Sequence, residues 1–183
     1  MKNVSFLIAS ILIVTICNLL TIKPVKAEQV ICPRNTEQDS KIKKNAVLDK
    51  FGISIEIPIN HRLMARTDGS IEILDNGTYE WLACLMKNPN ACCGAGFGGI
   101  SITTFSGNFF YSNVYMQVPN RENAFIIWKK EDEDINTVKL RFKTSKGATD
   151  VEYSGDYSIE DYNVKSYIES LIELSANIQV LQE

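Results

Sequence analysis

Histidine is nearly absent from this chain, because His61 is the only one among 183 residues. One imidazole cannot build a multi-histidine metal site. The adjacent Cys92 and Cys93 lack the C-x-x-C spacing of a structural zinc site and have no matching second pair. We therefore expect no metal and no cofactor, and we expect His61 to lie at a strand end with its polar tip in water.

The chain also lacks an excess of basic residues, with 19 Lys and Arg against 22 Asp and Glu. Nucleic acids and anionic membrane surfaces attract proteins that carry a basic patch. We therefore expect neither of them as a partner. The acidic run Glu131 to Asp134 lacks the alternating acid and glycine spacing of a calcium loop, so we interpret it as the charged tip of a hairpin.

Long apolar runs are absent except near the N-terminus, where Val4 to Leu20 is almost wholly apolar. Lys2 precedes this run, and Val25-Lys26-Ala27 places small residues where a signal peptidase reads. The pattern predicts a signal peptide over residues 1–27, cleaved after Ala27. A retained membrane anchor is the alternative, since the run is near the ~17-residue lower limit for a span.

Cleavage would leave 156 of the 183 residues and would change the formal charge from −3 to −6, because three lysines and no acid are removed. This length fits a single domain over residues 28–183. We expect no membrane span after cleavage. The predicted compartment is the periplasm, the thylakoid lumen or the extracellular space.

Four cysteines remain after cleavage: Cys32, Cys84, Cys92 and Cys93. An even number in an oxidising compartment predicts disulfides. Neighbouring cysteines seldom bond each other, since their Cα atoms lie ~3.8 Å apart, below the usual lower bound of ~4.4 Å. We expect Cys84 to pair with Cys92 or Cys93, and Cys32 to pair with the other one and so tether an N-terminal arm, residues 28–50.

The clearest fold signal lies in residues 51–85. Ile53, Ile55 and Ile57 alternate with Ser54 and Glu56, as a half-buried strand requires, and Pro58 ends the run. Asp68-Gly69 and Asn76-Gly77 are dipeptides typical of hairpin turns. Together they predict an antiparallel meander with strands at 62–67, 70–74 and 78–85.

The second half of the chain predicts more strands and one helix. Strands are expected at 100–105, 114–118, 124–130 and 137–144, with Val138, Leu140 and Phe142 facing inward and Lys139, Arg141 and Lys143 facing outward. Residues 158–177 form the one strong helix pattern, with Ser158 and Asp161 as a capping box. The sequence therefore predicts an α+β fold in which an antiparallel sheet of six or more strands packs with a long C-terminal helix.

Part of this pattern resembles a known family. The run FGISIEIP from Phe51 to Pro58, the meander after it, and the final helix with the tail from Asn177 to Val180 are similar to the PsbP/Mog1-like superfamily. Where many of its members have a Trp after the proline, this chain has Asn60-His61-Arg62. The resemblance implies a central antiparallel sheet flanked by helices and a non-catalytic role in assembly or binding.

The stretch from Met86 to Gly99 is a loop by composition, with one proline and several glycines and asparagines. Three of its glycines satisfy G-x-G-x-x-G, but a dinucleotide turn needs a helix after it and a strand-like segment follows here. We interpret the loop as a candidate partner-binding site, with Lys87 and Asn88 in polar contacts and Phe97 as an anchor. A purely structural connection is the alternative. A second candidate surface runs from Phe109 to Tyr115.

These observations favour an exported, non-catalytic binding or assembly protein of the cell envelope that acts by contact with a protein partner. One alternative is a secreted inhibitor or toxin-like ligand that presents a disulfide-closed loop. The other is a hydrolase with an unrecognised carboxylate site, because the many acidic residues offer many possible pairs.

Overall fold

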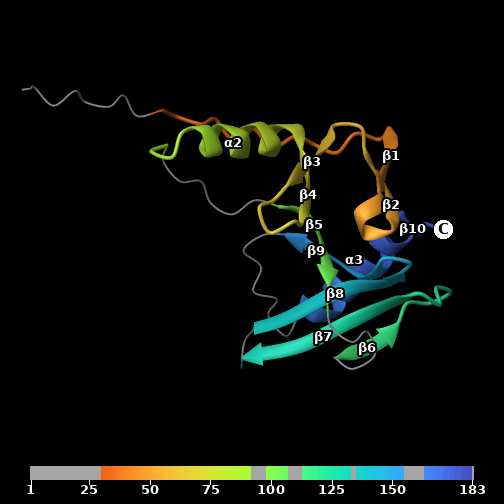
Figure 1. Ribbon diagram of the computed structural model, residues 1–183. Coiled ribbons are helices and arrows are strands. Elements are labelled where there is room, and N and C mark those ends of the chain that lie inside the picture. Colours follow the sequence, from red (N-terminus) through yellow and green to blue (C-terminus); the bar gives the residue numbers. More distant parts are fainter. Residues whose placement is uncertain (1–29, 92–97, 107–112, 133–134, 155–162, 183) are drawn as a thin grey trace, which may run out of the picture. The chain divides into compact units, whose positions relative to one another are not determined.

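The strands of the described residues form two antiparallel sheets (Figure 1). The computed structural model describes residues 30–91, 98–106, 113–132, 135–154 and 163–182. From Ile31 onward they belong to one compact unit. The predicted signal peptide and the residues Cys92, Cys93, Phe97, Phe109, Ser158 and Asp161 lie outside the described residues.

The smaller sheet has the strand order β1-β2-β10, with β1 at Lys43–Leu48, β2 at Ile53–Pro58 and β10 at Ile178–Val180. The alternating isoleucines of β2 are buried, as their spacing predicts. A short 3-10 helix, η1 at Asp49–Phe51, joins β1 to β2 and ends at Gly52, whose φ of 65° favours glycine. The predicted N-terminal arm thus contributes a strand to this sheet.

The larger sheet has seven strands in the order β3-β4-β5-β9-β8-β7-β6, and every pair is antiparallel. The prediction of an antiparallel sheet with six or more strands is confirmed. The strands lie at His61–Ala65 (β3), Ile71–Asp75 (β4), Gly99–Phe105 (β5), Val114–Gln117 (β6), Ala124–Asp132 (β7), Ile135–Thr144 (β8) and Gly147–Ser154 (β9).

The predicted strand at 78–85 is wrong, because residues Asn76–Lys87 form a helix, α2. Asp75 is its N-cap: its carboxylate accepts hydrogen bonds from Thr78 N at 3.0 Å and Thr78 Oγ1 at 2.6 Å. Trp81 and Leu82 then pack against Met64 and Leu74 of the larger sheet. The Asn76-Gly77 dipeptide therefore begins a helix and does not form a hairpin turn.

The second described helix, α3 at Val164–Ser175, packs against the larger sheet, as the C-terminal helix pattern predicts. One core cluster joins α3 to both sheets. Full burial of an aliphatic or aromatic side chain contributes about 1.5–3 kcal/mol. The cluster includes Phe51, Ile53, Ile55, Ile73, Ile102, Ile126, Leu140, Phe142, Val151, Leu171 and Ile178.

The hairpin of β7 and β8 is present, and Val138, Leu140 and Phe142 are buried as predicted. Arg141, however, is only 3% exposed and does not face water. Its Nε and Nη2 atoms donate to the two carboxylate oxygens of Asp150 at 2.6 and 2.7 Å. The neighbouring β9 therefore supplies the acid that lets this cation be buried, which alternation within β8 alone does not reveal.

A disulfide joins Cys32 to Cys84, with their Cα atoms 5.8 Å apart. The participation of both residues in a disulfide is confirmed, but the predicted pairing of Cys84 with Cys92 or Cys93 is wrong. Because residues 76–87 are helical, Cys84 faces the chain that leads into β1. A Cβ atom on Gly77 would lie 1.3 Å from the carbonyl oxygen of Asn35, so the arm passes directly over the first turn of α2.

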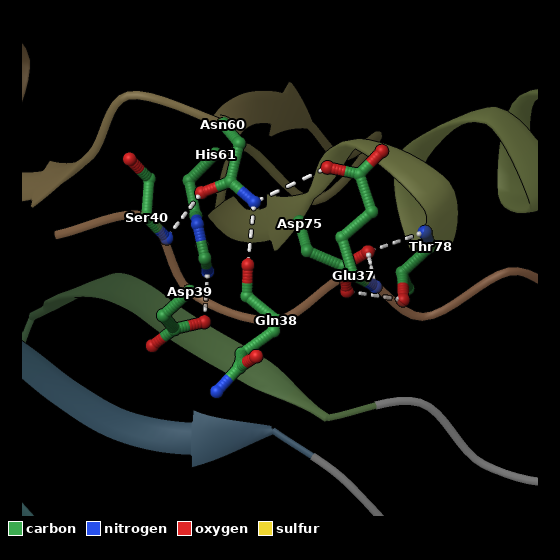
Figure 2. A network of polar contacts seen from close by, with 8 residues as sticks. All are labelled: Glu37, Gln38, Asp39, Ser40, Asn60, His61, Asp75 and Thr78. Carbon is green, nitrogen blue, oxygen red and sulfur yellow. Dashed lines mark hydrogen bonds and ion pairs between the residues drawn. The ribbon is translucent and has the colours of Figure 1, made fainter. Parts of the chain in front are cut away.

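Hydrogen bonds hold the next residues of the arm against β3, β4 and α2 (Figure 2). Asn60 is the centre of this network: its Nδ2 atom donates to Glu37 and Gln38, and its Oδ1 atom accepts from Ser40 N. His61 begins β3, as expected, but its side chain is only 15% exposed, and Nε2 lies 3.6 Å from Asp39. The expectation of a water-facing imidazole is wrong because the arm covers it.

Within the described residues, no helix is both long enough and apolar enough to cross a membrane.

Candidate functional site

The first wall of the candidate site is the N-terminal half of α3. Val164 and Ile168 are spaced four residues apart, so they lie on the same helix face, and both are buried. Lys165 and Glu169 each come one position later and form a parallel, exposed row. This half of the helix therefore presents an apolar stripe bordered by one cation and one anion.

The second wall is built by β6 and β7. Tyr115 of β6 packs edge-on against Trp128 of β7, with ring centroids 5.1 Å apart and an interplanar angle of 72°. Met116 is half-buried beside them. Val114 and Tyr115 remain 44% and 54% exposed, so two large side chains at neighbouring positions reach the surface.

A groove with a volume of about 400 Å³ lies between these walls. We call it the α3–β6 groove. Four apolar side chains and one tyrosine line it, together with the charged side chains of Lys165 and Glu169. The lining residues are Tyr115, Met116, Trp128, Val164, Lys165, Ile168 and Glu169.

Arg121 fixes the far end of α3 relative to the β6–β7 turn. Its guanidinium donates to the carbonyl oxygens of Ser175 and Ile178 and lies over the ring of Phe142. A cation at this position also complements the negative end of the helix dipole. Burial lowers the pKa of Arg121 from its ordinary value, but a guanidinium stays protonated in proteins.

Tyr153 supports the middle of the same helix from β9. Its hydroxyl donates to Ser170 O at 3.4 Å, and its ring packs edge-on against Tyr167. Burial, with a further contribution from the charge of Glu173, raises the pKa of Tyr153, so the phenol keeps its proton and remains a donor. The groove is thus built on elements that are held at several points.

Neither of the charged side chains of the groove, Lys165 and Glu169, forms an ion pair with another described residue. Catalysis requires polar groups that converge on a reacting atom. Here the only carboxylate of the lining is Glu169, which lies on the exposed face of α3. The arrangement is suited to binding an apolar side chain with charged groups beside it.

A second pocket, with a volume of about 490 Å³, lies between the arm and α2. Its charged side chains are already paired. Arg62 donates to Glu80 at 2.6 Å and to Asn76 at 2.8 Å, and Glu37 accepts from Asn60. Because these groups already hydrogen-bond to one another, this pocket is a weaker candidate for a ligand site than the α3–β6 groove.

Neither Lys87 nor Asn88 of the predicted contact loop lines the α3–β6 groove. Lys87 is exposed at the last position of α2, while Asn88 is the C-cap and donates its side-chain amide to Cys84 O at 2.9 Å. The Asn88 side chain is therefore occupied by the helix end. Phe97 lies outside the described residues.

Sequence reasoning missed most of the groove, because its residues are spread from position 115 to position 169. Tyr115 was part of the second candidate surface. The helical spacing of α3 also contained a signal, since Lys165 and Glu169 share one face. No pattern within a single element indicates that this face lies beside β6.

No group of three or more His, Cys, Asp or Glu side chains within the described residues is placed to hold a metal ion.

No protein-family model, curated protein or solved structure matches this chain. The class of the protein is therefore given by its described fold, an α+β arrangement of two antiparallel sheets and two helices. Its function has to be argued from the groove itself.

Proposed function

We propose that this chain is an exported, non-catalytic binding or assembly protein that acts by protein contact through the α3–β6 groove. One observation carries the proposal: an apolar groove lies open beside β6, with Tyr115 exposed at its edge. Aromatic side chains that are partly exposed next to an apolar pocket are typical anchors of protein interfaces.

The position of β6 in the sheet supports this interpretation. Among the described strands β6 pairs only with β7, so it forms one edge of the seven-stranded sheet. Edge strands offer unpaired backbone groups to another chain, and proteins protect them by short strand length, bulges, lysine or proline. β6 is four residues long and its register against β7 is irregular, but its residues, Val-Tyr-Met-Gln, include no lysine or proline. Extended segments of partners commonly bind to such edges.

The cysteine chemistry supports export. A disulfide between Cys32 and Cys84 forms and persists in oxidising compartments and is rare in the cytosol. This agrees with the predicted signal peptide over residues 1–27.

The test is capture of partners by a tagged copy of the exported protein from the envelope or the medium, with an untagged copy of the same chain counted as a partner. Tyr115→Lys places a charge at the groove and should abolish specific capture. Ile59→Lys is the matched control, because Ile59 is 52% exposed and lies outside the groove. Equal capture by wild type and by Tyr115→Lys would refute the proposed surface.

A further inference from the structure

We infer that the partner bound at the α3–β6 groove is a second copy of this chain, related to the first by a two-fold axis. This inference rests on the proposed function and names its partner. The observation that points to it is the charge pattern of the groove, which contains one exposed cation and one exposed anion on the same helix.

Lys165 and Glu169 are one helical turn apart, about 6 Å along the axis of α3. Both are exposed, and neither has an ionic partner within the described residues. In a two-fold interface, residue i of one copy faces residue j of the other, and the reverse also holds. An axis that passes between the two positions places Lys165 opposite the partner's Glu169 and Glu169 opposite the partner's Lys165.

The same axis suits the edge strand. A two-fold axis normal to a sheet sets two edge strands antiparallel, which is the geometry that every strand pair of this sheet already uses. Tyr115 and Met116 line the same groove as Lys165 and Glu169. Pairing β6 with the partner's β6 would cover Val114 and Tyr115 and satisfy the outer backbone groups of both strands.

Pairing of the two β6 strands would give a closed dimer to which no third copy can add. Each copy uses its β6 edge once, so a two-fold dimer leaves no further β6 edge for a third copy. The irregular register between Val114 and Met116 limits the regular pairing surface to a few residues. The structure therefore favours a dimer over an open-ended assembly.

The experiment is sedimentation velocity of the natively exported, oxidised protein over a range of concentrations. Wild type should show a concentration-dependent dimer. Lys165→Glu gives both groove positions a negative charge, and Glu169→Lys gives both a positive charge. Each single variant should weaken self-association by about tenfold, which corresponds to about 1.4 kcal/mol. The double variant Lys165→Glu/Glu169→Lys exchanges the charges and should restore dimerisation.

Mixing the two single variants is the most specific test of the charge pairing. Differently tagged Lys165→Glu and Glu169→Lys proteins, each weakened alone, should form a heterodimer with each other, because every position then faces an opposite charge. Both residues are exposed, so at protein concentrations too low for dimerisation the thermal unfolding midpoints of the variants should match that of wild type. A shared midpoint separates a lost interface from a lost fold.

Several outcomes would overturn the inference. If wild type stays monomeric at every concentration while Tyr115→Lys still abolishes capture, the partner is a different protein and the proposed function stands. If a dimer forms but neither the exchange variant nor the mixture restores it, the two-fold charge pairing is wrong. If neither self-association nor capture depends on Tyr115, the inference and the proposed function fail together.

Discussion

At the scale of single residues, the described part of the chain buries a charged pair whose two members bind each other directly. Arg141 and Asp150 form a two-point ion pair with side chains only 4% and 6% exposed. The centroid of the Phe105 ring lies 3.5 Å from the Arg141 guanidinium carbon, which adds a cation–π contact. A buried pair of this kind costs desolvation energy, so removing one member differs from removing both.

Replacing Asp150 by Ala should therefore lower the free energy of unfolding by about 3–5 kcal/mol, because Arg141 is left buried without its counter-charge. The double replacement Arg141→Met/Asp150→Leu should cost much less, since no charge remains. Urea unfolding measures both. Glu80→Ala is the control, because the exposed Arg62–Glu80 pair should be worth less than about 1 kcal/mol. Equal losses for the single and the double variant would contradict this account.

The lowered pKa of Asp75 predicts that the stability of the fold depends on pH. Burial raises the pKa of its carboxyl, but hydrogen bonds from Thr78 Oγ1, Thr78 N and Glu37 N outweigh burial, and the pKa lies below its ordinary value of 3.8. The unfolded chain therefore binds the proton more tightly than the folded chain. The stability that Asp75 contributes is complete above pH 3.8 and is lost as the pH falls through the folded-state pKa.

The variant Asp75→Asn keeps a capping oxygen but removes the charge, so it should unfold more easily than wild type near pH 6. As the pH falls, the difference in unfolding free energy should shrink. Chemical denaturation at a series of pH values from 6 to 2 measures that difference. A gap that stays constant over the whole series would show that the Asp75 carboxylate is not preferentially stabilised in the folded state.

At the scale of elements, α2 and the arm depend on each other. The arm is joined to α2 by the Cys32–Cys84 bond, and Arg34 of the arm lies over the ring of Trp81. Further along, the Asn60 network holds residues 37–40. Most of these contacts are polar and partly exposed, so the covalent link and the close backbone approach at Gly77 determine how firmly the arm is held.

Gly77→Ala tests that approach. Alanine favours helices more than glycine does, by about 1 kcal/mol, so an isolated α2 would gain stability. Here the added Cβ would collide with Asn35 O, and we expect the variant to displace the arm and to be less stable than wild type. Hydrogen exchange should become faster at Glu37 N and Ser40 N. Unchanged exchange there, together with higher stability, would show that the arm does not cross at Gly77.

At the scale of the whole molecule, the sequence predicts several single strands but not the contacts that they make with other elements. The alternation of Ile53, Ile55 and Ile57 and that of Val138, Leu140 and Phe142 predicts strands that the structure contains. The class of the fold follows from such segments. The residues that lie side by side in the sheet, such as Asp150 and Arg141, depend on the register between strands. The sequence of either strand alone does not reveal that register.

The helix α2 was missed for a physical reason. Asn76-Gly77 is typical of a hairpin turn, and Thr78, Tyr79 and Trp81 are residue types common in strands. The helical signal was the capping aspartate followed by Thr78 and by the apolar residues Trp81, Leu82 and Leu85, a spacing that matches one helix face. A strand at this segment would direct Cys84 toward Cys92 and Cys93, whereas the helix places it beside Cys32.

Photocrosslinking in the cell tests most directly whether a partner binds at the α3–β6 groove. A photoreactive amino acid in place of Tyr115 should give a crosslinked product on irradiation of cells that export the protein. The same amino acid in place of Ile59 should give none, although both positions are about half-exposed. Equal products from the two positions, or a product from position 59 alone, would contradict a contact surface at the groove.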